Sequence, residues 1–145
     1  MKINRKGLKV LLLATLLIVS ALVYNDSQAA VLAESMEIYT GWNHAFVKMP
    51  DGRWQAWGLN TSGQLGNGTT TNALKPIRVN VPTGTKKIVA GESHSVALTA
   101  TGEVWVTGGN TYGQLELGHY SNVTSWTKIS QTGVKDVTAS RVLHS

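Results

Sequence analysis

The feature that most constrains the fold is an internal repeat of fifty residues. Ten of the twenty-eight positions from 41 to 68 carry the same residue fifty positions later. Identity at one fixed spacing identifies a repeat array, in which each unit packs against its neighbours. His144 and Ser145 follow His94 and Ser95 at the same spacing, which predicts the start of a third unit. The predicted repeats lie near 37–86 and 87–136, with a third beginning at 137–145.

The repeated positions are dominated by glycine, with one histidine, one asparagine and a Gln-Leu pair in each unit. Such residues are typical of turns and corners, so we predict that they serve the fold rather than bind a ligand. In the first unit they include Gly41, His44, Gly52, Gly58, Asn60, Gly63, Gln64 and Leu65, and in the second Gly91, His94, Gly102, Gly108, Asn110, Gly113, Gln114 and Leu115.

The N-terminal segment has the pattern of a signal peptide. Four basic residues precede an apolar run at 10–23, and small residues follow at Ala29 and Ala30. Fourteen helical residues span about 21 Å, which is less than the roughly 30 Å of a bilayer's hydrocarbon core. We therefore predict that 1–29 is a cleaved signal peptide, that 30–145 is a partial β-propeller, and that the protein is secreted or at the cell surface. An uncleaved anchor is the alternative.

Charge and cysteine content restrict the partners. Without residues 1–29 the chain keeps nine basic and seven acidic residues, a net charge of +2. Because nucleic-acid binding calls for a clustered basic face, no nucleic-acid partner is expected. Membrane contact is expected only through the signal segment. The chain has no cysteine, so its stability outside the cell must come from packing without disulfides.

Each unit has the pattern of four short strands. Apolar runs at 45–49 and 54–57 flank an Asp-Gly turn, and 95–99 and 104–107 repeat this hairpin pattern. Further extended runs, predicted as third and fourth strands, lie at 76–81 and 86–90 in the first unit and at 126–129 and 135–139 in the second. Four strands per fifty residues, with glycine at the corners and no helical periodicity, predict an all-β fold of propeller blades.

The segments 90–99, 102–105 and 113–115 resemble the repeat of the regulator-of-chromosome-condensation family. The resemblance covers nearly all of 37–145 and implies a β-propeller, usually of seven blades. Some family members act as guanine-nucleotide exchange factors, and one secreted relative inhibits a β-lactamase. Because two blades and a fragment would leave strand edges open, we expect a fragment of a longer propeller, a self-associating chain, or a decayed remnant.

The candidate binding positions lie between the repeated glycine and histidine of each unit. Loops whose content varies on a constant scaffold are where binding specificity would be encoded, and neutral drift of an exposed loop is the alternative explanation of the variation. These positions are Trp42, Asn43, Glu92, Ser93 and Arg141. The other tryptophans of the hairpins, Trp54, Trp57 and Trp105, are predicted to pack within the blades.

No catalytic constellation, metal-ligand pattern or cofactor motif is present in the sequence, and none is predicted. His44, His94 and His144 occupy one repeated position, and each is expected to hydrogen-bond main chain within its own blade. The leading hypothesis is an exported, non-enzymatic module for protein-protein recognition. A cell-wall or glycan binding module, using exposed tryptophan, is the alternative, and a guanine-nucleotide exchange or enzyme-inhibitor role is the second alternative.

Overall fold

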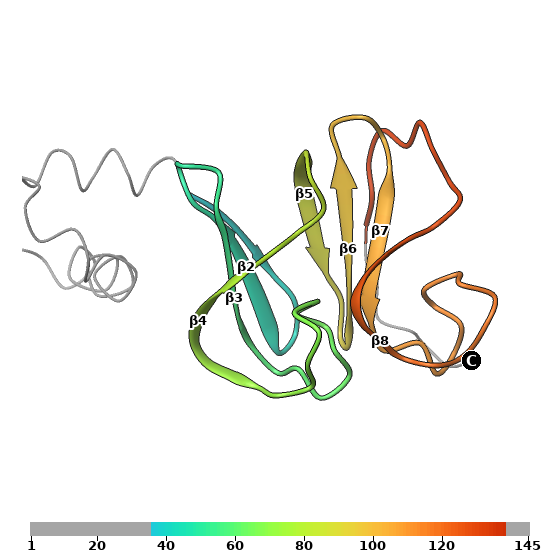
Figure 1. Ribbon diagram of the computed structural model, residues 1–145, viewed down its shortest axis with the longest axis horizontal. Helices are drawn as coiled ribbons and strands as arrows, with labels where there is room; N and C mark the ends of the chain where they lie inside the picture. Colours follow the sequence, from blue (N-terminus) through green and yellow to red (C-terminus); the bar gives the residue numbers. More distant parts are fainter. Residues whose placement is uncertain (1–35, 139–145) are drawn as a thin grey trace, which may run out of the picture. The chain divides into compact units, whose positions relative to one another are not determined.

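The structure, a computed structural model, describes residues 36–138. The predicted signal peptide and Arg141 lie outside this range, as does most of the predicted third repeat. The described residues form two four-stranded sheets (Figure 1). The first sheet holds β1 (Glu37–Thr40), β2 (His44–Lys48), β3 (Trp54–Gly58) and β4 (Ala73–Val79). The second sheet holds β5 (Thr85–Ala90), β6 (His94–Thr99), β7 (Val104–Gly108) and β8 (Val123–Lys128).

Both sheets are antiparallel meanders, which we call blade 1 (37–79) and blade 2 (85–128). Their registers repeat as the sequence does: Phe46 pairs with Ala56 in blade 1, and Val96 pairs with Val106 in blade 2. A bulge follows Ala56 in one blade and Val106 in the other. The prediction of all-β propeller blades with four antiparallel strands is confirmed. No helix of the described residues is long and apolar enough to cross a membrane.

Two strand predictions were wrong. The run 86–90 was predicted to be the fourth strand of the first unit, but it lies in β5 and pairs with β6 of blade 2. Blade 1 obtains its fourth strand from β1, which the sequence did not reveal. Residues 135–138 form no strand. The repeat equivalent of β6 begins at His144, outside the described range, so the strand that would pair with this run is not among residues 36–138.

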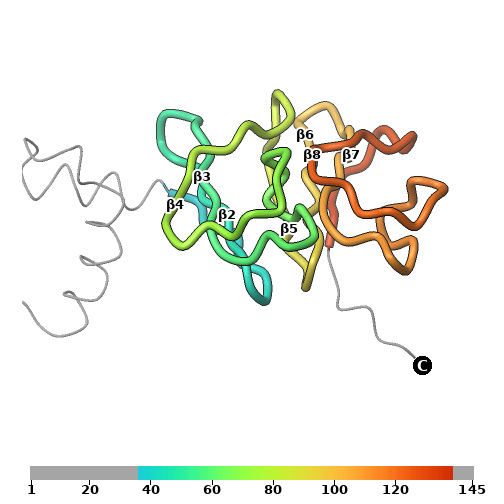
Figure 2. The backbone as a smooth tube through the Cα atoms, turned by 60° about the horizontal axis from the view of Figure 1, so that its bottom comes forward, coloured from blue at the N-terminus to red at the C-terminus, as the bar shows by residue number. Residues whose placement is uncertain are grey.

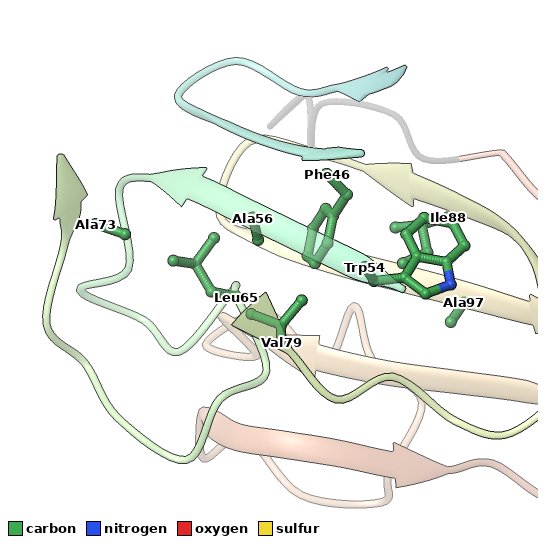
Figure 3. Close-up of a cluster of buried hydrophobic side chains, with 8 residues drawn as sticks. All are labelled: Phe46, Trp54, Ala56, Leu65, Ala73, Val79, Ile88 and Ala97. Carbon is green, nitrogen blue, oxygen red and sulfur yellow. The ribbon is translucent and has the colours of Figure 1, made fainter. Parts of the chain in front are cut away.

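The main core lies between the blades (Figure 3). Blade 1 and its connections contribute Phe46, Trp54, Ala56, Leu65, Ala73 and Val79, and blade 2 contributes Ile88 and Ala97. Trp57, Trp105 and Trp126 pack half-buried against this cluster. The tryptophans of the hairpins therefore serve packing, and aromatic side chains of this size supply much of the buried apolar area.

In each blade the third strand, β3 or β7, is followed by a loop that is organised by one buried asparagine. Asn60 Oδ1 accepts a hydrogen bond of 2.9 Å from the Leu65 amide, and Asn110 Oδ1 accepts one of the same length from Leu115. The side-chain amide thus replaces the main-chain partners that an irregular loop lacks. Both leucines are fully buried. In Figure 2 the 59–72 loop, in green, lies against blade 2, whereas the 109–122 loop, in orange, extends away from both sheets.

Candidate functional site

The predicted binding positions within the described range lie on two adjacent loops. The 41–43 loop joins β1 to β2, and the 91–93 loop joins β5 to β6. The Trp42 amide donates a hydrogen bond of 3.3 Å to the Gly91 carbonyl, which holds the two loops side by side. The structure therefore brings Trp42, Asn43, Glu92 and Ser93 onto one surface, which we call the loop surface.

The loops can approach so closely because Gly41 has no side chain. A Cβ atom at this position would lie 2.5 Å from the Gly91 oxygen, well inside the contact limit. The segments that follow β3 and β7 hold the 41–43 and 91–93 loops from the other side. The Leu59 amide donates to the Asn43 carbonyl at 2.7 Å, and the Gly109 amide donates to the Ser93 carbonyl at 2.8 Å. The main chain of the loop surface is thus held by hydrogen bonds on both blades.

The side chains on the loop surface are of mixed character. Trp42 has 60% of its surface exposed. Asn43 and Glu92 are exposed and Ser93 is half-buried. An indole beside a carboxylate and an amide offers a flat apolar face with hydrogen-bonding groups at its margin. This combination suits contact with another protein or with a sugar ring.

A buried polar link lies where the two blades meet. The Ser95 hydroxyl donates a hydrogen bond of 2.7 Å to the Gln64 carbonyl. His44 Nε2 lies 2.7 Å from the same hydroxyl oxygen. The Ser95 hydroxyl hydrogen is donated to the Gln64 carbonyl, so the His44 ring donates from Nε2. Within residues 36–138 its buried Nδ1 has no hydrogen-bond partner. Burial, followed by the nearby charge of His94, lowers the pKa of His44 to about 4, so the ring is neutral at pH 7.

This link corrects the expected role of the histidines. His44 was predicted to bond main chain within its own blade, but its partner is the side chain of Ser95 in the next blade. The cause is the packing of β2 against β5 and β6, which brings the repeated His and Ser positions of successive units together. Sequence reasoning missed Ser95. Its signal was present, because the His-Ser pair recurs at the spacing of the repeat.

The pairing of a serine with a histidine invites comparison with a catalytic dyad. A nucleophile must reach its substrate. Ser95 is 0% exposed, and its proton is committed to the Gln64 carbonyl. This pair therefore joins blades. Within residues 36–138 no group of three or more His, Cys, Asp or Glu side chains is placed to hold a metal ion.

Further exposed large apolar side chains were not singled out in the sequence analysis. Tyr112 and Tyr120 are exposed on the loop that follows β7, and Leu74 is exposed on β4. The repeat equivalents of the two tyrosines are Ser62 and Thr70. Comparing the two units position by position would have identified both tyrosines as features of blade 2 alone. The structure places them on a different loop from Trp42.

Two four-stranded antiparallel sheets that recur every fifty residues and share a core define consecutive blades of a β-propeller. Two family models of the regulator of chromosome condensation (RCC1) repeat match the chain, at residues 51–98 and 86–114. Together with the solved neighbours described next, these matches show that the chain belongs to the RCC1-repeat family.

Solved structures of RCC1 proteins share the fold. Yeast RCC1 (Prp20) in complex with Kap60 is similar with a TM-score of 0.58 and 28% identity, over 72% of this chain and 28% of that one. Human WBSCR16 is similar with a TM-score of 0.56 and 26% identity, over 67% of this chain and 27% of that one.

Sequence relatives are larger proteins of diverse activity. The Ultraviolet-B receptor UVR8 of Arabidopsis thaliana is 32% identical over 99 residues, which are 67% of this chain and 22% of the receptor. The human E3 ubiquitin-protein ligase HERC2 is 34% identical over 99 residues, which are 66% of this chain and 2% of the ligase. The chain thus spans less than a quarter of either relative.

Proposed function

We propose that this chain is an exported, non-enzymatic module for protein-protein recognition, and that its loop surface contacts the partner. The observation that carries the proposal is the exposure of Trp42, at 60%, on a loop fixed by hydrogen bonds to both blades. Tryptophan is enriched among the residues that dominate binding energy. A main chain that is already ordered loses little conformational entropy on binding, which favours affinity.

The relatives support a protein partner. Yeast RCC1 (Prp20) has been solved with Kap60 bound, and Prp20p of Saccharomyces cerevisiae has been described with its binding to Gsp1p and histones. Export is supported by the signal-peptide pattern of residues 1–29. The absence of an enzymatic role is supported by the burial of Ser95, the serine that lies beside His44.

The test compares two exposed apolar side chains on one scaffold. The purified protein is immobilised and exposed to proteins of the culture medium and cell surface, as wild type, as Trp42→Ala and as Leu74→Ala. We expect Trp42→Ala to lose specific partners at least tenfold and Leu74→Ala to keep them. If both variants retained the partners equally, the loop surface would not be part of the contact.

Export has its own test: N-terminal sequencing of the secreted protein checks whether cleavage occurs after Ala29.

Binding of a glycan is the second candidate, because the exposed indole of Trp42 could also stack on a sugar ring. Titration with wall polysaccharide, followed by tryptophan fluorescence, separates the two candidates. Quenching that disappears in Trp42→Ala, without any protein bound to the wild type, would favour the glycan. An unchanged spectrum at millimolar sugar would exclude it.

A further inference from the structure

A groove of about 390 Å³ lies between the β2–β3 turn, the end of β4 and the connection from β4 to β5. We call it the basic groove, because three basic side chains line it and no acidic side chain of residues 36–138 does: Lys48, Arg53 and Arg78. The strand β2 begins beside the loop surface and ends at the groove with Lys48. The two surfaces therefore lie at opposite ends of blade 1.

The charges of the basic groove differ from those at the same place in blade 2. Fifty residues further on, Glu103 stands at the position of Arg53, and Lys128 at that of Arg78. In blade 2 these two side chains form an ion pair with each other. In blade 1 both positions are basic, so a second cation replaces the carboxylate that neutralises the lysine in blade 2. Because like charges at neighbouring positions repel each other, an anion from outside the chain would stabilise this arrangement.

The balance of charge at the groove leaves one cation free. Lys48 Nζ lies 3.3 Å from a carboxylate oxygen of Glu37. The Arg53 guanidinium pairs with Asp51 in the same turn. Within residues 36–138 the exposed Arg78 forms no ion pair. The three cations and their two carboxylate partners therefore have a surplus of one positive charge, which lies on Arg78.

We propose that the basic groove binds an acidic side chain of a partner protein, with its carboxylate on the Arg78 guanidinium. The proposal rests on the proposed function in taking a protein as the partner, and it adds a second contact surface with its own chemistry. A guanidinium binds a carboxylate through two parallel hydrogen bonds. Apolar neighbours of the acidic residue would lie against Val81 and Pro82, which are half-buried in the wall of the groove.

The size of the charge surplus favours a carboxylate over other anions. One positive charge matches one carboxylate, whereas a phosphate dianion calls for a larger excess, and a polyanion calls for a row of cations. The apolar part of the lining also suits a peptide, because it offers contact to the side chains beside the acidic one.

Both walls of the groove are ordered by hydrogen bonds of the main chain. On one side the Ala100 amide of blade 2 donates to the Gly84 carbonyl at 2.9 Å. On the other side the Met49 amide donates to the Arg53 carbonyl at 2.8 Å. The groove is thus present before a ligand arrives, and binding orders little more than side chains.

The test is an NMR titration of the purified protein with arginine side chains labelled with ¹⁵N. The probe is a capped peptide, Gly-Leu-Glu-Leu-Gly, and its control has glutamine in place of glutamate. We expect the glutamate peptide at millimolar concentration to shift the Nε–Hε signals of Arg78 and Arg53. The glutamine peptide should leave both signals in place.

Two variants with the same change of net charge show whether the groove is responsible. Arg78→Glu places a carboxylate beside Arg53, as blade 2 has one beside Lys128. It should weaken binding of the glutamate peptide by at least about tenfold. Lys75→Glu changes an exposed residue of the same strand that does not line the groove, and should bind as wild type.

Three outcomes would overturn the proposal. The first is an Arg78 signal that does not respond to the glutamate peptide, or responds equally to the glutamine peptide. The second is equal weakening by Arg78→Glu and Lys75→Glu, because the attraction would then come from the net charge of the protein. The third is a stronger response of Arg78 to inorganic phosphate than to the peptide, which would assign the groove to phosphate groups.

Failure of this proposal is distinguishable from failure of the proposed function. If Trp42→Ala loses captured proteins but the glutamate peptide does not bind the wild type, the groove alone is excluded. If the peptide binds at Arg78 but Trp42→Ala keeps every captured protein, the loop surface is excluded and the groove is retained.

Discussion

The Oγ atom of Ser95 on β6 lies 2.7 Å from Nε2 of His44 on β2, and this contact ties one blade to the next. Both residues are buried, so the hydrogen bond forms in a region from which water is excluded. Hydrogen bonds in such surroundings contribute modestly when made, but are costly when one partner is removed. The link therefore has more effect on blade association than on the internal structure of either sheet.

Removal of the Ser95 hydroxyl should weaken the whole described unit. Ser95→Ala leaves the Gln64 carbonyl and the His44 ring without a buried partner. We expect the free energy of unfolding to fall by about 1–3 kcal/mol, as measured by urea denaturation. Ser130→Ala, at an exposed site, is the matched control and should change it by less than about 0.5 kcal/mol. Equal effects of both variants would contradict the role assigned to the link.

Acid should destabilise the protein through His44. Burial holds the pKa of this ring at about 4 in the folded chain, against 6.5 for an ordinary histidine. Protons therefore bind the unfolded chain more tightly, so the stabilisation is complete above pH 6.5 and is lost as the pH falls toward 4. The loss should reach about 3 kcal/mol, since one pKa unit corresponds to about 1.36 kcal/mol.

The measurement for His44 is urea denaturation between pH 7.5 and 4.5. Burial also lowers the pKa of His94, which adds a loss of the same sign. Asp136 lies outside this window, because its hydrogen bond with Lys87 lowers the carboxyl pKa. His44→Gln keeps a donor but cannot titrate, so its stability should depend less on pH. If His44→Gln kept the full pH dependence of the wild type, the loss of stability in acid would be due to a group other than His44.

Gly66 and Glu116 provide a matched test of backbone strain. They occupy one repeat position, with φ values of +64° and +55°. A Cβ atom on Gly66 would also lie 2.5 Å from Nε1 of Trp126. Gly66→Ala should therefore cost about 2 kcal/mol or more of unfolding free energy, from strain and overpacking together. Glu116→Gly should raise it by about 0.5 kcal/mol, because the strain is relieved. Destabilisation by both changes would contradict this account.

Loss of the Asn60 side chain should release the loop that it organises. Its oxygen accepts from the Leu65 amide at 2.9 Å, and its nitrogen donates to the Thr71 carbonyl at 3.1 Å. Because the side chain is fully buried, Asn60→Ala should cost about 2–4 kcal/mol in chemical denaturation. Asn60→Asp keeps the acceptor for Leu65 but turns a carboxylate oxygen toward the Thr69 and Thr71 carbonyls, so it should destabilise the protein at least as much as Asn60→Ala. The exposed Asn80→Ala is the control and should behave as wild type.

The sequence predicted the fold because its repeat is strict. Glycine corners, hairpin turns and the Gln-Leu pair all recur at one spacing, and each is a local signal. β1 escaped notice because its sequence, EIYT, has no turn signal on its N-terminal side and is largely exposed. The run 86–90 was recognised as extended but assigned to the wrong blade, since hydrogen bonding between strands depends on contacts that no local pattern encodes.

The candidate site was predictable in outline only. The variable positions between the repeated glycine and histidine identified Trp42 and Glu92, but their joint surface depends on the approach of Gly41 to Gly91. The link between Ser95 and His44 was missed although the His-Ser pair recurs, because the repeat shows that Ser95 matters but does not show that its partner lies in a different blade. Tyr120 was not singled out from the sequence, although it is exposed where blade 1 has Thr70.

The core between the blades has a consequence for synthesis on the ribosome. Phe46 and Trp54 pack against Ile88 and Ala97, and Trp126 covers them from the end of blade 2. The amino-terminal sheet therefore cannot complete its packing when its own last strand emerges from the exit tunnel. It must wait for most of the following fifty residues, which are translated at roughly 5–20 residues per second. During those seconds the nascent chain exposes apolar side chains that chaperones can recognise.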